Sequence, residues 1–100
     1  MKGKWRITSM AMWDKAFLDL IEPAHITFSD QNEGTLAFGC INAALACWLT
    51  TTDADFIFEG HDEMEPTAGK GWAELLPNGL LEGEISFQNG DETSFTARKW

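Results

Sequence analysis

The segment FIFEGHDEMEPTAGKGWAEL, from Phe56 to Leu75, has two strand-like flanks, FIFEG and GKGWAEL, on either side of a polar stretch. Flanks of this kind favour β-strands, so the intervening HDEMEPTA has to turn the chain. Pro66 and Gly69 suit such a loop, because proline fixes a backbone angle and glycine permits unusual ones. The segment therefore predicts two neighbouring strands joined by a loop.

Similar segments of alternating character recur along the chain at short spacing, broken by Gly, Asn, Asp and Pro. This pattern is typical of an all-β meander rather than of helices packed on a sheet. An exception is DKAFLDLIEP, where Asp14 can cap a short helix and Pro23 can end it. We therefore expect one domain over residues 1–100, a small antiparallel meander β-barrel with one short helix after the first strand. About eight strands are expected, at residues 3–13, 24–29, 35–41, 44–51, 55–60, 70–76, 80–88 and 92–99.

The turn PNG at residues 77–79 leaves two registers open. A two-residue Asn-Gly loop would pair Trp72 with Ile85, and it would place Glu74 on the same face as these apolar residues. A longer loop would instead turn Trp72 outward. The sequence does not decide whether Glu74 faces the interior.

The last hairpin contains the turn sequence QNGD. A three-residue loop at 89–91 with a bulge sets Ile85 against Phe95 and keeps both faces of the hairpin consistent. We therefore expect the three-residue loop.

The two cysteines, Cys40 and Cys47, are too few for a disulfide scaffold. A tight loop near Ala43 and Ala44 would place them opposite each other across a hairpin. Opposed cysteines could form a disulfide if oxidised, but a small apolar pair is commoner in a core. We expect two free thiols that lie close together.

The charge of the chain excludes several classes of partner. Sixteen acidic residues against seven basic ones give a formal charge of -9, which would repel a phosphate backbone and anionic lipid surfaces. The N-terminal region has no apolar run of signal-peptide length, and no stretch approaches the roughly 20 apolar residues of a membrane span. We therefore expect a soluble cytoplasmic protein that binds neither nucleic acid nor membranes.

Gly3-Lys4-Trp5 lies on the first expected strand, and Arg98 lies on the last. These two ends of the chain resemble the calycin pattern of lipocalins, fatty-acid-binding proteins and avidins. In those families a Gly-x-Trp places a tryptophan under the barrel, and an arginine of the last strand packs across it. The resemblance implies that Trp5 and Arg98 form a pair that closes one barrel end. The chain is short for that superfamily and lacks the long C-terminal helix of lipocalins.

A second resemblance rests on a set of residues in the second half of the chain. They are Glu59-Gly60, Asp62-Glu63, Glu65 and Gly69-Lys70-Gly71-Trp72-Ala73, with Phe38-Gly39, Gly90-Asp91 and Phe95 in agreement. This set looks like the hallmark of a small family of uncharacterised bacterial proteins. The resemblance implies a bacterial cytoplasmic origin and brings no activity with it.

No motif in the chain indicates an enzyme or a cofactor. The sequence AGKG lacks the spacing of a phosphate-binding loop, and the acidic residues near it would repel phosphate. The oxygens of Asp62, Glu63 and Glu65 lack the spacing of a calcium loop, so we expect no metal. His25 lies on a strand and has no nucleophile motif near it.

The aromatic content suggests two functions. Five Trp and seven Phe residues could line a ligand pocket or fill the barrel. The first hypothesis is a binding module that accepts a small apolar ligand at the barrel mouth, with Trp5, Trp13 and Trp48 as its lining. The alternative is a protein-interaction or homodimerisation module with a filled core, using exposed aromatics such as Trp72 or Trp100.

The polar segment at residues 61–69 would form the rim of such a mouth. Carboxylates there can accept backbone N–H bonds from their own loop or pair with a lysine, which would hold the rim in one shape. The expected rim residues are His61, Asp62, Glu63, Glu65 and Lys70.

Overall fold

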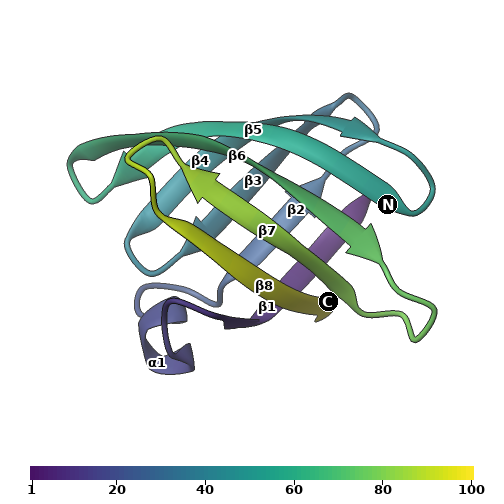
Figure 1. Cartoon of the computed structure of the whole chain (residues 1–100), viewed down its shortest axis with the longest axis horizontal. Coiled ribbons are helices and arrows are strands. Elements are labelled where there is room, and N and C mark those ends of the chain that lie inside the picture. The colour runs from purple at the N-terminus through teal and green to yellow at the C-terminus, as the bar shows by residue number, and fades with distance from the viewer.

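Eight antiparallel strands close into a barrel in the computed structural model, which describes residues 1–100 (Figure 1). Each strand pairs with its neighbours in the sequence, and the last strand pairs with the first. The predicted antiparallel barrel with a short helix after its first strand is confirmed. The strands are β1 (Gly3–Met10), β2 (His25–Phe28), β3 (Glu33–Phe38), β4 (Ile41–Leu49), β5 (Asp53–Asp62), β6 (Glu65–Leu75), β7 (Leu81–Phe87) and β8 (Glu92–Lys99), and the helix is α1 (Lys15–Leu18).

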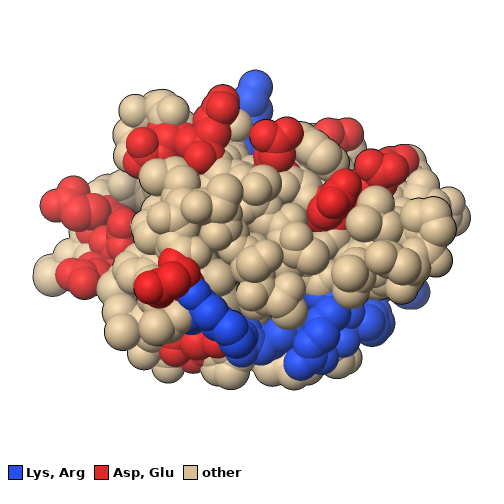
Figure 2. All heavy atoms as spheres, turned by 60° about the horizontal axis from the view of Figure 1, so that its bottom comes forward, with Lys and Arg blue, Asp and Glu red and all other residues tan.

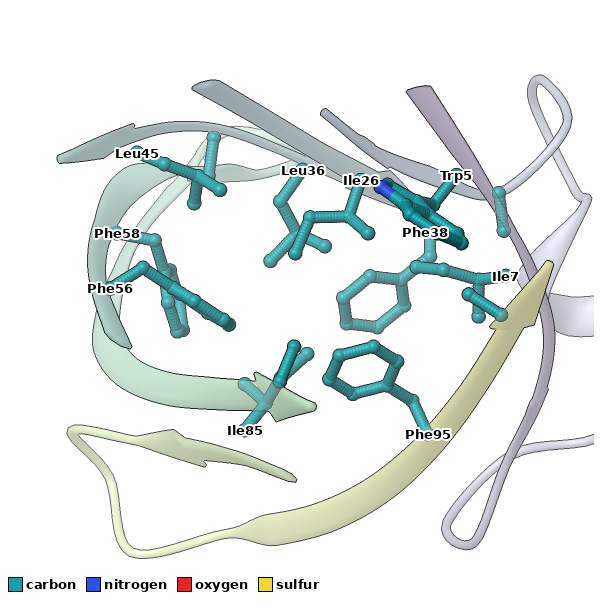
Figure 3. Close-up of a cluster of buried hydrophobic side chains, with 14 of the residues drawn as sticks. Trp5, Ile7, Ile26, Leu36, Phe38, Leu45, Phe56, Phe58, Ile85 and Phe95 are labelled. Atoms are coloured by element: carbon teal, nitrogen blue, oxygen red, sulfur yellow. The ribbon is translucent and has the colours of Figure 1, made fainter. Parts of the chain in front are cut away.

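Side chains that alternate along the strands fill the interior of the barrel (Figure 3). In β4, for example, every second residue from Ile41 to Cys47 is buried, and the residues between them are exposed. Twenty-two buried residues form one hydrophobic cluster, to which every strand contributes. The core is therefore made of side chains in mutual contact across the barrel.

Two phenylalanine rings of β5 lie on glycines of β6. Phe56 pairs with Gly71, and Phe58 pairs with Gly69. A Cβ atom added at Gly71 would lie 2.5 Å from the Phe56 ring, and one at Gly69 would lie 2.7 Å from the Phe58 ring. Glycine is required at both positions because the rings occupy the space that a side chain would take.

The turn between β5 and β6 is shorter than the sequence indicated. Asp62 pairs with Glu65, so only Glu63 and Met64 lie between the strands. Most of the expected loop at 61–69 is therefore strand. Its polar residues remain in the ladder because β4 pairs with β5 as far as Asp62. Pro66 is tolerated in β6 because β7 pairs with that strand only from Gly69 onward.

The hairpin of β6 and β7 has the longer of the two loops that the sequence left open. Leu75 pairs with Leu81, which leaves a loop at residues 76–80. Trp72 and Glu74 consequently face outward, and Ala73 faces the core between them.

The loop between β7 and β8 has the expected length but lies one residue earlier, at 88–90. Phe87 N donates to Asp91 O at 2.7 Å, and Ile85 pairs with Thr93 rather than with Phe95. Because the shift in pairing is by two residues, the apolar residues stay on the inner face.

The expected proximity of Cys40 and Cys47 is wrong. The turn is at Gly39 and Cys40, since Phe38 pairs with Ile41, and Cys47 pairs with Phe56 further along β4. Gly39 has a φ of 56°, a left-handed angle that glycine adopts without strain. The two thiols are free, and seven residues of extended chain separate them by roughly 23 Å.

Helix α1 closes one end of the barrel, which we call the helix end. Asp14 caps it by accepting from Phe17 N at 2.9 Å, and the Leu18 side chain is fully buried. Leu18 O accepts from Gly39 N at 2.8 Å, which fixes the helix to the β3–β4 turn. Trp13 packs against Phe17, with ring centroids 5.6 Å apart, and against Phe38 and Phe87 inside the barrel.

A bidentate ion pair holds α1 to strand β1 of the barrel wall. We call α1 together with Trp13 and Asp19 the plug. Arg6 Nη1 and Nη2 each donate to an Asp19 carboxylate oxygen at 2.8 Å. Asp19 Oδ1 also accepts from Ala24 N at 2.9 Å. The guanidinium of Arg6, followed by this backbone bond, holds the pKa of the Asp19 carboxyl well below its usual range.

The contact of Phe56 with Gly71 predicts that Gly71→Ala destabilises the barrel. The added methyl group collides with the ring, so the free energy of unfolding should fall by about 1–3 kcal/mol in urea unfolding. Lys70→Ala on the adjacent, outward-facing position is the control and should change it by less than about 0.5 kcal/mol. A Gly71→Ala protein as stable as wild type would contradict the ring position.

The Arg6–Asp19 pair predicts that Asp19→Asn lowers the free energy of unfolding by about 2 kcal/mol at neutral pH. Because the folded pKa of Asp19 is lowered, its contribution is present above the unfolded carboxyl pKa of about 4 and is lost as the pH falls below it. The difference between wild type and variant should therefore shrink progressively below about pH 5. Chemical denaturation at a series of pH values measures this.

Asp30→Asn is the matched control, because the Lys2–Asp30 pair is exposed on both sides. It should change stability by less than about 1 kcal/mol at any pH. An Asp19→Asn effect that is independent of pH would show that the carboxylate charge does not hold the plug.

Candidate functional site

The barrel end opposite α1 is closed by Trp5, whose side chain is only 4% exposed. Its Nε1 donates to Met1 O at 3.3 Å. The cation beside its ring is Lys99, with Nζ 5.0 Å from the ring centroid. The expected Trp5–Arg98 pair is not formed, because alternation along β8 directs Ala97 inward and Arg98 outward to solvent.

The three tryptophans expected to line a ligand pocket lie apart. Trp5 is at the end with the chain termini, and Trp13 packs on the plug at the helix end. Trp48 projects from the outer face of β4 and is 58% exposed, because the register of β4 directs Cys47 inward instead. The structure therefore does not bring these three residues together.

The expected rim residues also do not form a group. Glu63 contacts the β3–β4 turn, where Cys40 Sγ donates to Glu63 Oε1 at 3.4 Å and Glu63 N donates to Cys40 O at 3.1 Å. Lys70 lies on the outer face of β6 and makes no ion pair with Asp62, Glu63 or Glu65. His61 and Asp62 are exposed strand residues. No three His, Cys, Asp or Glu side chains are arranged to hold a metal ion.

The outer face of β4, β5 and β6 carries the most exposed aromatic surface on the strands. Trp48 pairs with Asp55, and Asp55 pairs with Trp72, so the three side chains form one row across three strands. Ile57 follows in the next row and is 51% exposed, while Trp72 is 39% exposed. We call the surface formed by Trp48, Asp55, Ile57 and Trp72 the Trp48–Trp72 face.

Small residues make the surface beside this face hollow. The hollow is lined mainly by outward-facing residues of four neighbouring strands, β4 to β7, and it therefore opens on the outer surface. The core residues Leu45, Phe58 and Phe87 lie at its floor. These residues include Ala44, Ala46, Ile57, Ala68, Lys70 and Ser86.

Carboxylates surround the Trp48–Trp72 face. Asp53 pairs with Glu74, and Glu74 pairs with Glu82, so three acidic side chains lie directly opposite one another. Glu84 pairs with Trp72 and so continues the row of Trp48, Asp55 and Trp72 onto β7. None of these four carboxylates is in an ion pair. Like charges in opposed positions destabilise a sheet, so the fold alone does not favour this row.

Basic residues gather on the other side of the barrel, over β1 and β8 (Figure 2). The Trp100 ring lies there, with Lys4 Nζ 4.3 Å and the Arg6 guanidinium carbon 5.9 Å from its centroid. The basic residues of this surface are Lys2, Lys4, Arg6, Arg98 and Lys99.

Sequence reasoning named Trp72 as an exposed aromatic and missed Asp55. It also assigned Trp48 to the interior. The alternation of buried residues in INAALACWL, with Cys47 inward, indicates that Trp48 faces outward. The pairing of Trp48 with Asp55 depends on the register between β4 and β5, which alternation within one strand does not contain.

Comparison with protein-family models, with curated proteins and with solved structures gives no significant match. The chain contains no helix with the length and hydropathy that a bilayer-spanning helix needs.

The contact between Glu63 and Cys40 predicts that the Cys40 thiol is alkylated slowly. The hydrogen bond to the Glu63 carboxylate, with partial burial, raises the pKa of the Cys40 thiol. Glu63→Gln removes the negative charge, so the thiolate fraction and the rate of alkylation by iodoacetamide at about pH 8 should rise. Peptide mass spectrometry measures the rate at each cysteine.

Glu65→Gln, in the same hairpin but without contact to the thiol, is the control and should leave the rate unchanged. Cys47 should stay unreactive in all variants, because it is buried. Equal rates at Cys40 in wild type and Glu63→Gln would show that the two side chains do not interact in solution.

Proposed function

We propose that this barrel is a protein-interaction module whose binding surface is the Trp48–Trp72 face. The observation that carries the proposal is the pair of tryptophans, 58% and 39% exposed, in one row of the outer face. Tryptophan is one of the residue types enriched among those that dominate the energy of protein–protein binding. Trp48, Trp72 and Ile57 are exposed on one face, so they contribute nothing to the barrel core.

The filled interior supports an external site over a ligand at the barrel mouth. The rings of Phe38, Phe56 and Phe95 point into the centre of the barrel, where they meet other buried side chains (Figure 3). Trp5 covers one end and the α1 plug covers the other. A small apolar ligand would have to displace one of these groups, whereas a partner at the Trp48–Trp72 face displaces only water.

The size of the barrel is compatible with a partner on this face. A stable interface buries about 800 Å² on each partner, which is roughly one seventh of the 5717 Å² surface of the chain. Small residues in the hollow beside the tryptophans permit close approach, and the polar residues around them supply a rim. The proposed role is binding, without a reaction or a cofactor.

A two-fold homodimer through this face has less support. In such a dimer the same patch of both copies meets, so Glu74 and Glu82 of one copy would face the acidic residues of the other. Like-charge contact of this kind opposes association. A partner of different charge is therefore favoured.

The proposal predicts that peptides selected on the protein depend on the two tryptophans. Short random peptides displayed on phage are panned against wild type, and each enriched clone is assayed against Trp48→Ala, Trp72→Ala and Trp100→Ala. Trp100 is an exposed tryptophan on the opposite side and provides the matched control. Enriched clones should lose about 30-fold or more in affinity on Trp48→Ala and Trp72→Ala, and should bind Trp100→Ala as they bind wild type.

A thermal-shift panel of small apolar compounds is run beside the selection. Clones indifferent to Trp48 and Trp72, together with compounds that raise the melting temperature of both tryptophan variants, would support the barrel-mouth ligand instead.

A further inference from the structure

We infer that the partner segment is cationic and places an Arg or Lys side chain between Trp48 and Trp72, above Asp55. This rests on the proposed function and specifies the chemistry of the partner at the same site. Three observations support it: Trp48, Asp55 and Trp72 lie in one row, carboxylates surround that row, and no cation of this chain lies over either tryptophan ring.

The row places two indole side chains on either side of a carboxylate. Adjacent strands are about 4.8 Å apart, so the backbones at Trp48 and Trp72 lie about 10 Å apart, with Asp55 midway. A cation held above Asp55 would therefore have an indole side chain on each side, and a ring face attracts a cation within roughly 6 Å of its centroid. The carboxylate below can accept a charge-assisted hydrogen bond from the same cation.

No cation of this chain lies over the ring of Trp48 or Trp72. Lys99 lies over Trp5, and Lys4 and Arg6 lie over Trp100, so the cation–π contacts of the chain are at those tryptophans. Lys70, although it is two residues from Trp72, is over neither Trp48 nor Trp72. The face therefore has aromatic surface and carboxylates without the cation that would complete them.

The charge around the row selects a cationic partner. Six outward carboxylates on β5, β6 and β7 stand against the single ammonium group of Lys70, and none of the six is in an ion pair. Complementary charge would neutralise the opposed Asp53, Glu74 and Glu82, and it would also steer the encounter. The six carboxylates are Asp53, Asp55, Glu59, Glu74, Glu82 and Glu84.

A second copy of this chain is the weaker occupant, although its β1–β8 surface is basic. Arg6 is paired with Asp19, Lys2 with Asp30, and Lys4 lies over Trp100, so most of that charge is already engaged. Two copies that each carry -9 also repel each other. The cation therefore comes from a different polypeptide.

The test uses the peptides that the phage selection enriches. Each is resynthesised in its original form and with every Arg and Lys replaced by Gln, and affinity is measured by calorimetry for wild type, Asp55→Asn and Glu22→Gln. We expect enriched Arg or Lys, binding lost in the Gln peptides, and about tenfold weaker binding to Asp55→Asn. Glu22→Gln, an exposed acid beside β2 and remote from the face, should bind as wild type does. Affinity should fall steeply toward about 1 M salt, where the Debye length is about 3 Å.

The outcomes separate this inference from the proposed function. Peptides that need Trp48 and Trp72 but bind equally well as Gln versions overturn the cationic partner and leave the protein-interaction module standing. Peptides that need neither tryptophan overturn both. Sedimentation of the protein alone adds a further outcome: association that Trp72→Ala and Arg98→Glu each abolish would make a second copy the occupant and overturn the inference.

Discussion

The inner face of the barrel depends on the contact between two phenylalanines of β5 and two glycines of β6. Phe56 over Gly71 and Phe58 over Gly69 can form only in one register, because a slip of one residue would turn both rings to solvent. Once these rings face inward, Ala54 and Ala73 must do so as well, and the register passes to β4 and β7 through their ladders with this hairpin. The choice of inside and outside for half the barrel follows from this one contact.

The same contact determines the outer face. Asp55 and Ile57 alternate with the inward phenylalanines, and Trp72 alternates with the inward Gly71, so these residues cannot be buried without unburying the rings. The exposed aromatic row is thus a direct consequence of core packing on the other side of the same strands. A barrel that needed only solubility could carry polar residues at these positions, since nothing inside depends on them.

The sequence was sufficient for the architecture and insufficient for the site. Alternation and the capping residue Asp14 identify an antiparallel barrel with a short helix, since both are local patterns. The grouping of site residues depends on pairing between strands, where one misplaced turn moves a whole strand relative to its neighbour. Placing the turn at Ala43 rather than Gly39 brought Cys40 near Cys47, and no local pattern shows that Trp48 lies opposite Asp55. The expected Trp5–Arg98 pair came from the resemblance to calycins. Alternation in β8 directs Arg98 to solvent, and Lys99 is the residue whose ammonium group lies over the Trp5 ring.

Closure of the barrel through β1 and β8 has a consequence for the order of folding. Arg6 pairs with Arg98, so the seam joins residues from opposite ends of the chain, and the entropy of closing so long a loop opposes the seam until the rest of the sheet exists. During synthesis the sheet from β1 to β7 must remain open, with β1 as an unpaired edge, until β8 leaves the ribosome. An open edge recruits other strands, and Lys4 and Arg6 of β1 are of the residue types that discourage such recruitment. The positive charge of the first strand is thus a feature that disfavours aggregation of the open sheet before the barrel closes.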